Sequence, residues 1–230
     1  MKRLAAFLAV SVLILFCLGL AGCGGKKDAA EQLAPAGKEE PVAGLFAKGQ
    51  RIEGMAYDYI LTAPGAKMTG KAWVQGKKLR TEGVVGGQKI VTIIDGDANI
   101  VYSYYPSQNM AVMVSVGDMG KETQTPADYT KGVDPNAVKV AGTMVCDGAK
   151  CKVILVQGEG GSGEVRMWVR EDYGIPVRVE TTAPDGTKVV MEYKNVKIEP
   201  QSPELFKLPA GVKITDVNAM MKQLPQVPRR

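Results

Sequence analysis

Two cysteines in the second half of the chain are the residues whose type and spacing most directly suggest chemistry. Cys146 and Cys151 flank the four-residue link DGAK between two β-rich runs, so strands of equal length would bring them opposite each other. Cross-strand Cβ atoms lie about 4.5–5.5 Å apart, slightly more than a disulfide prefers, and strand twist can close that gap. We predict a disulfide, with free buried thiols and redox or metal chemistry as the alternatives.

The sequence contains no histidine, which removes Ser-His-Asp and Cys-His nucleophilic catalysis and the commonest transition-metal ligand. The carboxylates Asp95, Asp97 and Asp118 lie near expected turns. The Asp95–Asp97 segment resembles the start of an oxygen-ligand cation loop, but the distant bidentate glutamate of such a loop is missing. Turn formation explains these residues, so we predict no enzyme, no metal site and no cofactor.

Composition describes a soluble, turn-rich β protein, with 27 glycines, 13 prolines and 45% hydrophobic residues. The formal net charge of +5 is small, and no dense run of lysine and arginine is present. A nucleic-acid partner is therefore not expected.

The N-terminus carries the strongest targeting signal. Lys2 and Arg3 precede an apolar run, Leu4–Leu20, and the run ends in the tetrapeptide LAGC at residues 20–23. This tetrapeptide resembles a bacterial lipobox that is cleaved before Cys23; the alternative is an ordinary signal peptide with a chance cysteine. We predict a lipoprotein signal peptide over 1–22, acyl chains such as palmitate on Cys23 that anchor the protein to the cell membrane, and an extracytoplasmic location. Residues 23–41 are small, charged and interrupted by proline, which predicts a flexible tether.

A single domain is predicted over 42–230, organised around Gln88–Val116. This stretch contains three β-rich runs separated by turn residues, and both alternating faces of Ile90–Ile94 are apolar, so that strand needs cover on both sides. Three preceding runs make a meander of about six strands, and a second β block follows at Val138–Ile198. Three elements are expected to provide cover: a helix at Val42–Lys48, an irregular excursion at Asp118–Asn136, and a C-terminal helix capped by Thr215 and ending at Leu224.

Eleven methionines are many for a chain of this size, and most fall in predicted strands. Methionine fills irregular gaps and adapts to variable apolar ligands, so an ordinary soft core and a ligand cavity are both consistent with this number. The two tryptophans, Trp73 and Trp168, lie on strand faces that also carry lysine or arginine, where arginine stems can pack along them.

Three segments together resemble the LolA/LolB-like superfamily of outer-membrane lipoprotein-sorting proteins. They are YDYILTAPGAKMTGKAWVQGKKLRTEG at 57–83, KIVTIIDGDANIVYSYYPSQNMA at 89–111 and LFKLPAGVKI at 205–214. The resemblance implies a mostly β fold, a curved antiparallel half-barrel (an incomplete β-barrel) with a few covering helices. It also implies an apolar cavity that binds a lipid or the acyl chains of a lipoprotein, in a carrier, acceptor or exchanger.

The cavity-lining residues follow from the alternation of the strands, on the assumption that the chosen face is the concave one. They are Leu45, Phe46, Met55, Tyr57, Tyr59, Leu61, Met68, Val74, Leu79, Ile94, Tyr102, Tyr104, Met110, Met167, Val179, Met191 and Met220. The alternative function is a membrane-tethered sensor or regulatory module that binds a protein partner with the same fold. A lined apolar tunnel favours lipid, whereas a packed core with an exposed apolar patch favours a partner.

Overall fold

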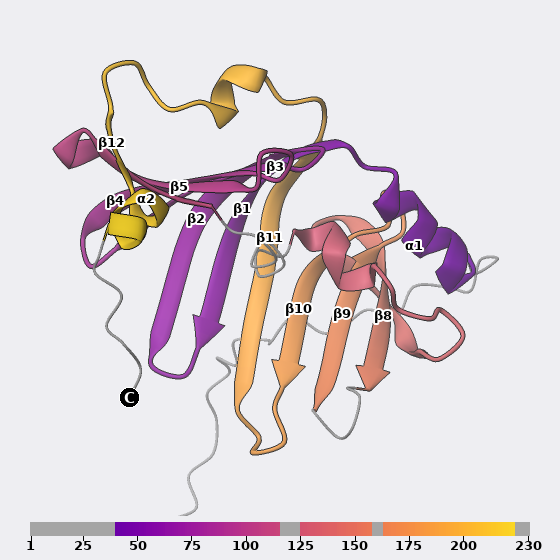
Figure 1. Cartoon of the computed structure of the whole chain (residues 1–230). Coiled ribbons are helices and arrows are strands. Elements are labelled where there is room, and N and C mark those ends of the chain that lie inside the picture. Colours follow the sequence, from indigo (N-terminus) through magenta and orange to yellow (C-terminus); the bar gives the residue numbers. More distant parts are fainter. Residues whose placement is uncertain (1–39, 116–124, 158–162, 224–230) are drawn as a thin grey trace, which may run out of the picture. The chain divides into compact units, whose positions relative to one another are not determined.

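The structure is a computed structural model that describes residues 40–115, 125–157 and 163–223, with side chains to residue 220 (Figure 1). The predicted lipobox, Cys23, most of the tether and Asp118 lie outside the described residues. Among the described helices, none is long and apolar enough to cross a membrane.

The described strands form one twelve-stranded sheet in the order β12-β6-β5-β4-β3-β2-β1-β11-β10-β9-β8-β7. The sheet is open, with β12 and β7 at its edges, and the predicted curved half-barrel is confirmed. All neighbouring strands are antiparallel except β12 and β6, which are parallel. The strands are β1 (Gly54–Ala63), β2 (Ala66–Gln75), β3 (Lys78–Val85), β4 (Gln88–Asp95), β5 (Ile100–Tyr105), β6 (Met110–Ser115), β7 (Lys139–Cys146), β8 (Ala149–Gln157), β9 (Glu164–Arg170), β10 (Pro176–Thr182), β11 (Lys188–Ile198) and β12 (Lys213–Asp216).

Short turns fold the first half of the chain into the predicted meander of six strands. Asp95 shows how the sequence makes these turns: its carboxylate accepts hydrogen bonds from the backbone N–H groups of Asp97 and Ala98, both at 3.1 Å. It also forms an ion pair with Lys78 across the end of β3. The turn role predicted for Asp95 is confirmed. The second half is another meander, β7–β11, and the two meanders meet where β1 pairs with β11.

The sheet has two differently covered faces, which we call the inner face and the outer face. The inner face carries Met55, Val74 and Met167, and the outer face carries Ile93 and Tyr104. Strand β4 contributes to both cores: Val91 and Ile93 are buried in the outer core, whereas Ile94 is only partly buried against the inner core. The cover predicted for both sides of this strand is therefore complete on the outer side alone.

The inner face is covered by α1 (Val42–Gln50) and by η3 (Pro126–Thr130), a 3-10 helix, which contact each other (Figure 1). Both were predicted as covering elements. Gly49 allows α1 to approach the turn before β10 closely, since a Cβ at this position would lie 2.3 Å from the carbonyl oxygen of Gly174. The glycine is therefore a packing requirement, and a larger residue would lift the end of α1 off the sheet.

The outer face over β3–β6 is covered by the segment that follows β11. This segment contains η5 (Pro203–Phe206), whose Phe206 is buried in the outer core with Leu205, Leu208 and Val212 beside it. Arg80 fastens it, because its Nη1 donates a hydrogen bond to the carbonyl oxygen of Leu205 at 3.0 Å.

The C-terminal helix differs from its prediction. Helix α2 (Val217–Gln223) begins after Asp216, whose carboxylate accepts a hydrogen bond from the Ala219 N–H at 3.0 Å. Thr215 lies in β12, so it does not cap the helix. The reason is that Lys213–Asp216 pairs with β6, which delays the start of the helix. Met220 is 57% exposed and lies outside the inner core, so its place in a cavity lining stays a prediction.

Candidate functional site

The inner face is the candidate binding site, because it holds the larger apolar core and most of the predicted lining residues. Eight predicted residues are buried in this core, and three more pack against it. The buried ones are Leu45, Phe46, Met55, Tyr57, Val74, Leu79, Met167 and Val179, and the partly buried ones are Tyr59, Ile94 and Met191.

Two predicted lining residues, Tyr102 and Tyr104, lie on the outer face instead. The register pairs Tyr104 with Val91 and Tyr102 with Ile93, so both tyrosines face the outer core. Ile94, which was predicted to share their face, pairs with Val101 on the inner side. Since β4 is apolar on both faces, its alternation alone does not show which neighbours share a face.

Three other predicted residues point to the inner face but lie outside the inner core. Leu61 pairs with Met68 and Met191 at the far end of β1. Met68 is 40% exposed, and Met110 is half-buried opposite Tyr105. These side chains extend the apolar face beyond the part that α1 and η3 cover.

The inner face of β4–β6 continues this apolar surface. Its side chains, Ile90, Val101, Tyr105, Val112 and Val114, are all partly exposed, whereas those under α1 and η3 are almost completely buried. One half of the inner face is therefore closed by local elements, and the other half keeps apolar area accessible.

A tyrosine cluster lies at the centre of the closed half. The rings of Tyr57 and Tyr193 meet edge to face, with centroids 5.2 Å apart. Tyr193 is 2% exposed, and its hydroxyl is buried without a hydrogen bond of normal geometry, although the Tyr129 hydroxyl is near enough to influence its pKa. Burial is the main cause that raises the pKa of Tyr193, and Tyr129, Tyr57 and Asp128 of η3 raise it further. All these tyrosines are neutral at physiological pH, so their hydroxyls are available as donors.

One glutamine holds η3 against α1. The Nε2 of Gln50, at the end of α1, donates to the carbonyl oxygen of Ala127 at 2.8 Å and to Thr130 Oγ1 at 3.0 Å. Within η3, Thr125 and Asp128 form a reciprocal capping box. The cover is thus ordered internally by its own cap, and it is joined to α1 by the hydrogen bonds of Gln50 and by apolar packing of Ala127 and Tyr129 against the inner core.

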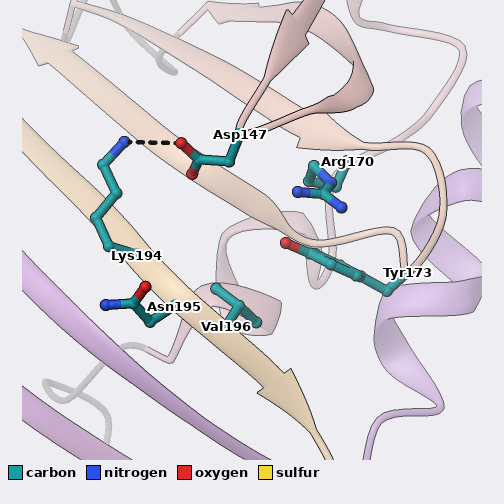
Figure 2. Close-up of a pocket in the computed structure, with 6 residues that line it drawn as sticks. All are labelled: Asp147, Arg170, Tyr173, Lys194, Asn195 and Val196. Carbon is teal, nitrogen blue, oxygen red and sulfur yellow. Dashed lines mark hydrogen bonds and ion pairs between the residues drawn. The ribbon is translucent and has the colours of Figure 1, made fainter.

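A polar pocket of about 330 Å³ lies at the border of the inner apolar core, because its lining residues Tyr173 and Val196 also pack against that core (Figure 2). Figure 2 shows Arg170 and Tyr173 on one side of it and the Lys194–Asp147 ion pair, 3.5 Å between charged atoms, on the other. Asn195 and Val196 complete the lining. The guanidinium of Arg170 is fixed by stacking on the Tyr173 ring at 4.8 Å and by two hydrogen bonds to Asp172, at 3.1 and 2.6 Å.

The predicted disulfide partners lie next to two of the lining residues, since Asp147 follows Cys146 in the chain and Arg170 pairs with Cys151. Cys146 and Cys151 are free thiols in the structure. The hairpin turns at residues 147 and 148 rather than over the whole DGAK link, so Cys146 pairs with Ala149 and Cys151 pairs with Met144. The expected direct opposition is therefore wrong, and the cysteines are diagonal neighbours on the outer face. Their oxidation to a disulfide stays a prediction.

The tryptophans do not pack on each other. Trp73 lies against the outer core with Arg80 6.0 Å above its ring, and Trp168 has Arg178 at 5.2 Å. Each arginine also pairs with a glutamate on its own strand, Glu82 or Glu180. These are outer-face stacks within a network of ion pairs.

Sequence reasoning missed several inner-face residues. Tyr193 follows the predicted Met191 by two positions in β11, so the same alternation identifies it. Ile154 and Ile175 are completely buried in this core, but their runs are apolar on both faces or too short to show alternation. The polar pocket carries no local signal, because its residues come from the ends of two different hairpins and from within β11.

Comparisons with known proteins identify the fold. No protein-family model matches the chain, and no curated protein matches its sequence. Solved structures do match: an uncharacterized conserved protein from Thermus thermophilus is 12% identical, with a TM-score of 0.54, over 76% of this chain and 96% of that one.

Two further structures share the resemblance. MucB in its complex with MucA from Pseudomonas aeruginosa is 12% identical, with a TM-score of 0.48, over 76% of this chain and 62% of that one. A LolA superfamily protein from Nitrosomonas europaea is 11% identical, with a TM-score of 0.37, over 74% of this chain and 98% of that one. At these identities the likeness concerns the fold alone, and LolA superfamily and lipoprotein-sorting structures are among the neighbours, as the sequence motifs predicted.

Proposed function

We propose that this protein is a membrane-tethered, extracytoplasmic binding protein that holds the acyl chains of a lipid or lipoprotein against its inner face. The observation that carries the proposal is the unequal cover of that face. Apolar side chains line the inner face from β8 to β6, but α1 and η3 cover mainly its β1 and β8–β11 side. An acyl chain supplies the missing cover for the other side without needing directional contacts.

The energy of such binding follows from the accessible apolar surface. Each buried methylene contributes about 0.8 kcal/mol, so ten methylenes contribute roughly 8 kcal/mol before the cost of ordering the chain. That value corresponds to dissociation constants of about micromolar or weaker. Methionine side chains such as Met68 and Met110 adapt to chains of different length and saturation. A site of this kind selects a class of ligand rather than one molecule.

The Tyr193 hydroxyl gives this site one polar group. A buried donor without a partner costs about 1–3 kcal/mol, and a ligand oxygen that reaches it recovers part of that cost. Reaching it requires η3 to move, which breaks the two hydrogen bonds of Gln50. The ligand is therefore an acyl compound whose ester or carboxyl oxygen enters beneath η3 while the tail lies along β4–β6.

The tether completes the proposal. Acylation of Cys23 places the binding domain within reach of a membrane surface, and a tethered protein acts as an acceptor, local exchanger or sensor instead of a free carrier. Replacing Cys23 with alanine is expected to move the protein from the membrane fraction to the soluble extracytoplasmic fraction. If the Cys23→Ala variant stays in the membrane fraction, Cys23 is not the membrane anchor.

Native mass spectrometry and uptake of a fluorescent fatty acid test the binding site. The Val112→Gln variant, which places an amide on the accessible inner face, is expected to weaken uptake about tenfold, because burying an unpaired amide costs more than 1 kcal/mol. Val84→Gln is the matched control, since Val84 is 60% exposed on the outer face. The absence of both bound lipid and uptake in the unaltered protein would refute the proposal.

A protein partner is the second candidate function, and the free edge of the sheet favours it. Among the described strands, β7 pairs only with β8, and it exposes Val140 and Val145. Such an edge accepts an added strand from a partner. A photoreactive residue at position 145 is expected to crosslink to that partner in cells, whereas the same residue at position 84 is not. Equal crosslinking at both positions would exclude strand addition at β7.

A further inference from the structure

The positions of Cys146 and Cys151 do not fit a permanent structural disulfide. As diagonal neighbours in an antiparallel pair they have Cα atoms roughly 7–8 Å apart, whereas disulfides require about 4.4–6.8 Å. Forming the bond therefore needs a shift at the end of the hairpin. A disulfide that has to distort its strands is more easily reduced than one in relaxed geometry.

The hairpin end is free to make this shift. Strand β7 is an edge strand, and its last pair with β8, Cys146 with Ala149, closes the two-residue turn at Asp147 and Gly148. Side chains of two other strands donate hydrogen bonds to this end, and both bonds are long: Arg170 Nη1 to the Cys146 carbonyl oxygen at 3.4 Å, and Lys194 Nζ to the Asp147 carboxylate at 3.5 Å. Moving Cys146 towards Cys151 thus disturbs no other strand pair.

The two thiols are unequal in access and charge. Cys151 is completely buried, whereas Cys146 is partly exposed. A hydrogen bond from Cys151 is the main cause that lowers the pKa of Cys146, and Arg170 and Lys194 lower it further. The same interaction and burial raise the pKa of Cys151. One partly exposed, activated thiol beside one buried thiol is the arrangement of an attacking and a resolving cysteine.

We propose that Cys146 and Cys151 form a thiol–disulfide exchange site, which reacts with a small carboxylate-bearing disulfide held in the adjacent polar pocket. The pocket volume of about 330 Å³ suits a small ligand. Lys194 supplies the charge for a ligand carboxylate, because its pair with Asp147 is long and almost half-exposed and is easily exchanged. The guanidinium of Arg170 is held in place beside it by Tyr173 and Asp172.

The reaction transfers two electrons from the protein to the disulfide. The Cys146 thiolate attacks one sulfur of RS–SR, forms a mixed disulfide and releases RS⁻. That thiolate takes the proton of Cys151, and the Cys151 thiolate attacks the sulfur of Cys146 and expels the second RS⁻. The products are the Cys146–Cys151 disulfide and, after protonation from water, two RSH molecules.

Oxidised glutathione is the probe, applied to the reduced full-length chain with peptide mapping that assigns each adduct to its cysteine. The Cys151→Ser variant is expected to accumulate one glutathione on Cys146, and the unaltered protein to form the internal disulfide. In the unaltered protein, iodoacetamide is expected to label Cys146 at least about tenfold faster than Cys151. Equal labelling of the two cysteines, or an internal disulfide that glutathione does not reduce, would overturn the proposal.

The role of the pocket is tested by comparing glutathione disulfide with uncharged hydroxyethyl disulfide. Lys194→Ala is expected to slow the reaction with glutathione disulfide by up to about fivefold. The uncharged reagent is expected to slow less, because it loses only the contribution of Lys194 to the lowered pKa of Cys146. Lys188→Ala is the matched control, because Lys188 lies in the same strand but its partner is Glu180. If Lys194→Ala slows neither reagent, or both equally, the pocket does not hold the disulfide.

Discussion

Replacing Tyr193 with phenylalanine removes the buried hydroxyl that has no hydrogen bond of normal geometry, and we expect the variant to be more stable than the original protein. The ring and its edge-to-face contact with Tyr57 remain, so no cavity is created. An unsatisfied buried polar group costs about 1–3 kcal/mol. Because the nearby Tyr129 offsets part of this cost, we expect a gain of about 1 kcal/mol, which raises the Tm of a domain of this size by roughly 2–4 °C.

Urea unfolding followed by the fluorescence of Trp73 and Trp168 measures this change, since the two tryptophans report on β2 and β9. Tyr57→Phe is the matched control: it belongs to the same ring pair, but its hydroxyl is not a buried atom without a partner. We expect no gain from the control. A loss of 1 kcal/mol or more on Tyr193→Phe would show that the hydroxyl is satisfied, and would refute the reasoning.

The Tyr193→Phe variant also shows whether the Tyr193 hydroxyl binds the ligand or is only an unsatisfied group in the core. If Tyr193 contacts the ligand oxygen, Tyr193→Phe is more stable in the free state but binds a fatty acid about fivefold to tenfold more weakly, the effect of one hydrogen bond. A stability gain with unchanged affinity would leave the inner face as an apolar site without a polar anchor.

Three further predictions concern the covering elements and the turns. Gly49→Val should destabilise the protein by about 1–3 kcal/mol, because a Cβ at this position would lie 2.3 Å from the Gly174 carbonyl oxygen. Gly44→Ala on the same helix should instead raise the free energy of unfolding by about 0.5–1 kcal/mol, and thermal unfolding measures both changes. Arg80→Ala should release the η5 segment at a cost of about 2 kcal/mol and expose it to limited proteolysis. The hydrogen bond from Lys78 is the main cause that holds the pKa of Asp95 below its usual range. The ionised Asp95 carboxylate therefore stabilises the folded protein above about pH 4, and this stabilisation is lost as the pH falls through the lowered pKa. Asp95→Asn should therefore flatten the acid side of the stability profile, and an unchanged profile would contradict the ion pair.

Much of the fold was predictable from the sequence because antiparallel hairpins are local. Gly and Asp residues mark the turns, and alternation between them marks the strands, so the six-strand meander, α1 and the η3 cover are as expected. The pairing of β12 with β6 was not predictable, because the four residues of β12 show no strand pattern of their own and form a strand only beside β6.

The site was predictable only where one strand face is apolar and the other polar. In β1 and β9 this contrast is clear, and the lining residues Met55, Tyr57 and Met167 were identified correctly as members of one face. In β4 both faces are apolar, so the faces of Tyr102 and Tyr104 depended on a register that no local pattern determines. Contacts between residues of separate hairpins, such as those lining the polar pocket, depend on the whole sheet.

The pairing of β1 with β11 has a consequence for the order of folding. These strands join the two meanders and lie far apart in the sequence, so the first meander is synthesised while the edge of β1 has no partner. Pairing between strands that are far apart in the sequence forms slowly, and until it forms the unpaired edge of β1 can associate with other chains. The shift in register between Ala56 and Asp58 interrupts this edge, which makes it a poorer template for a foreign strand during that interval.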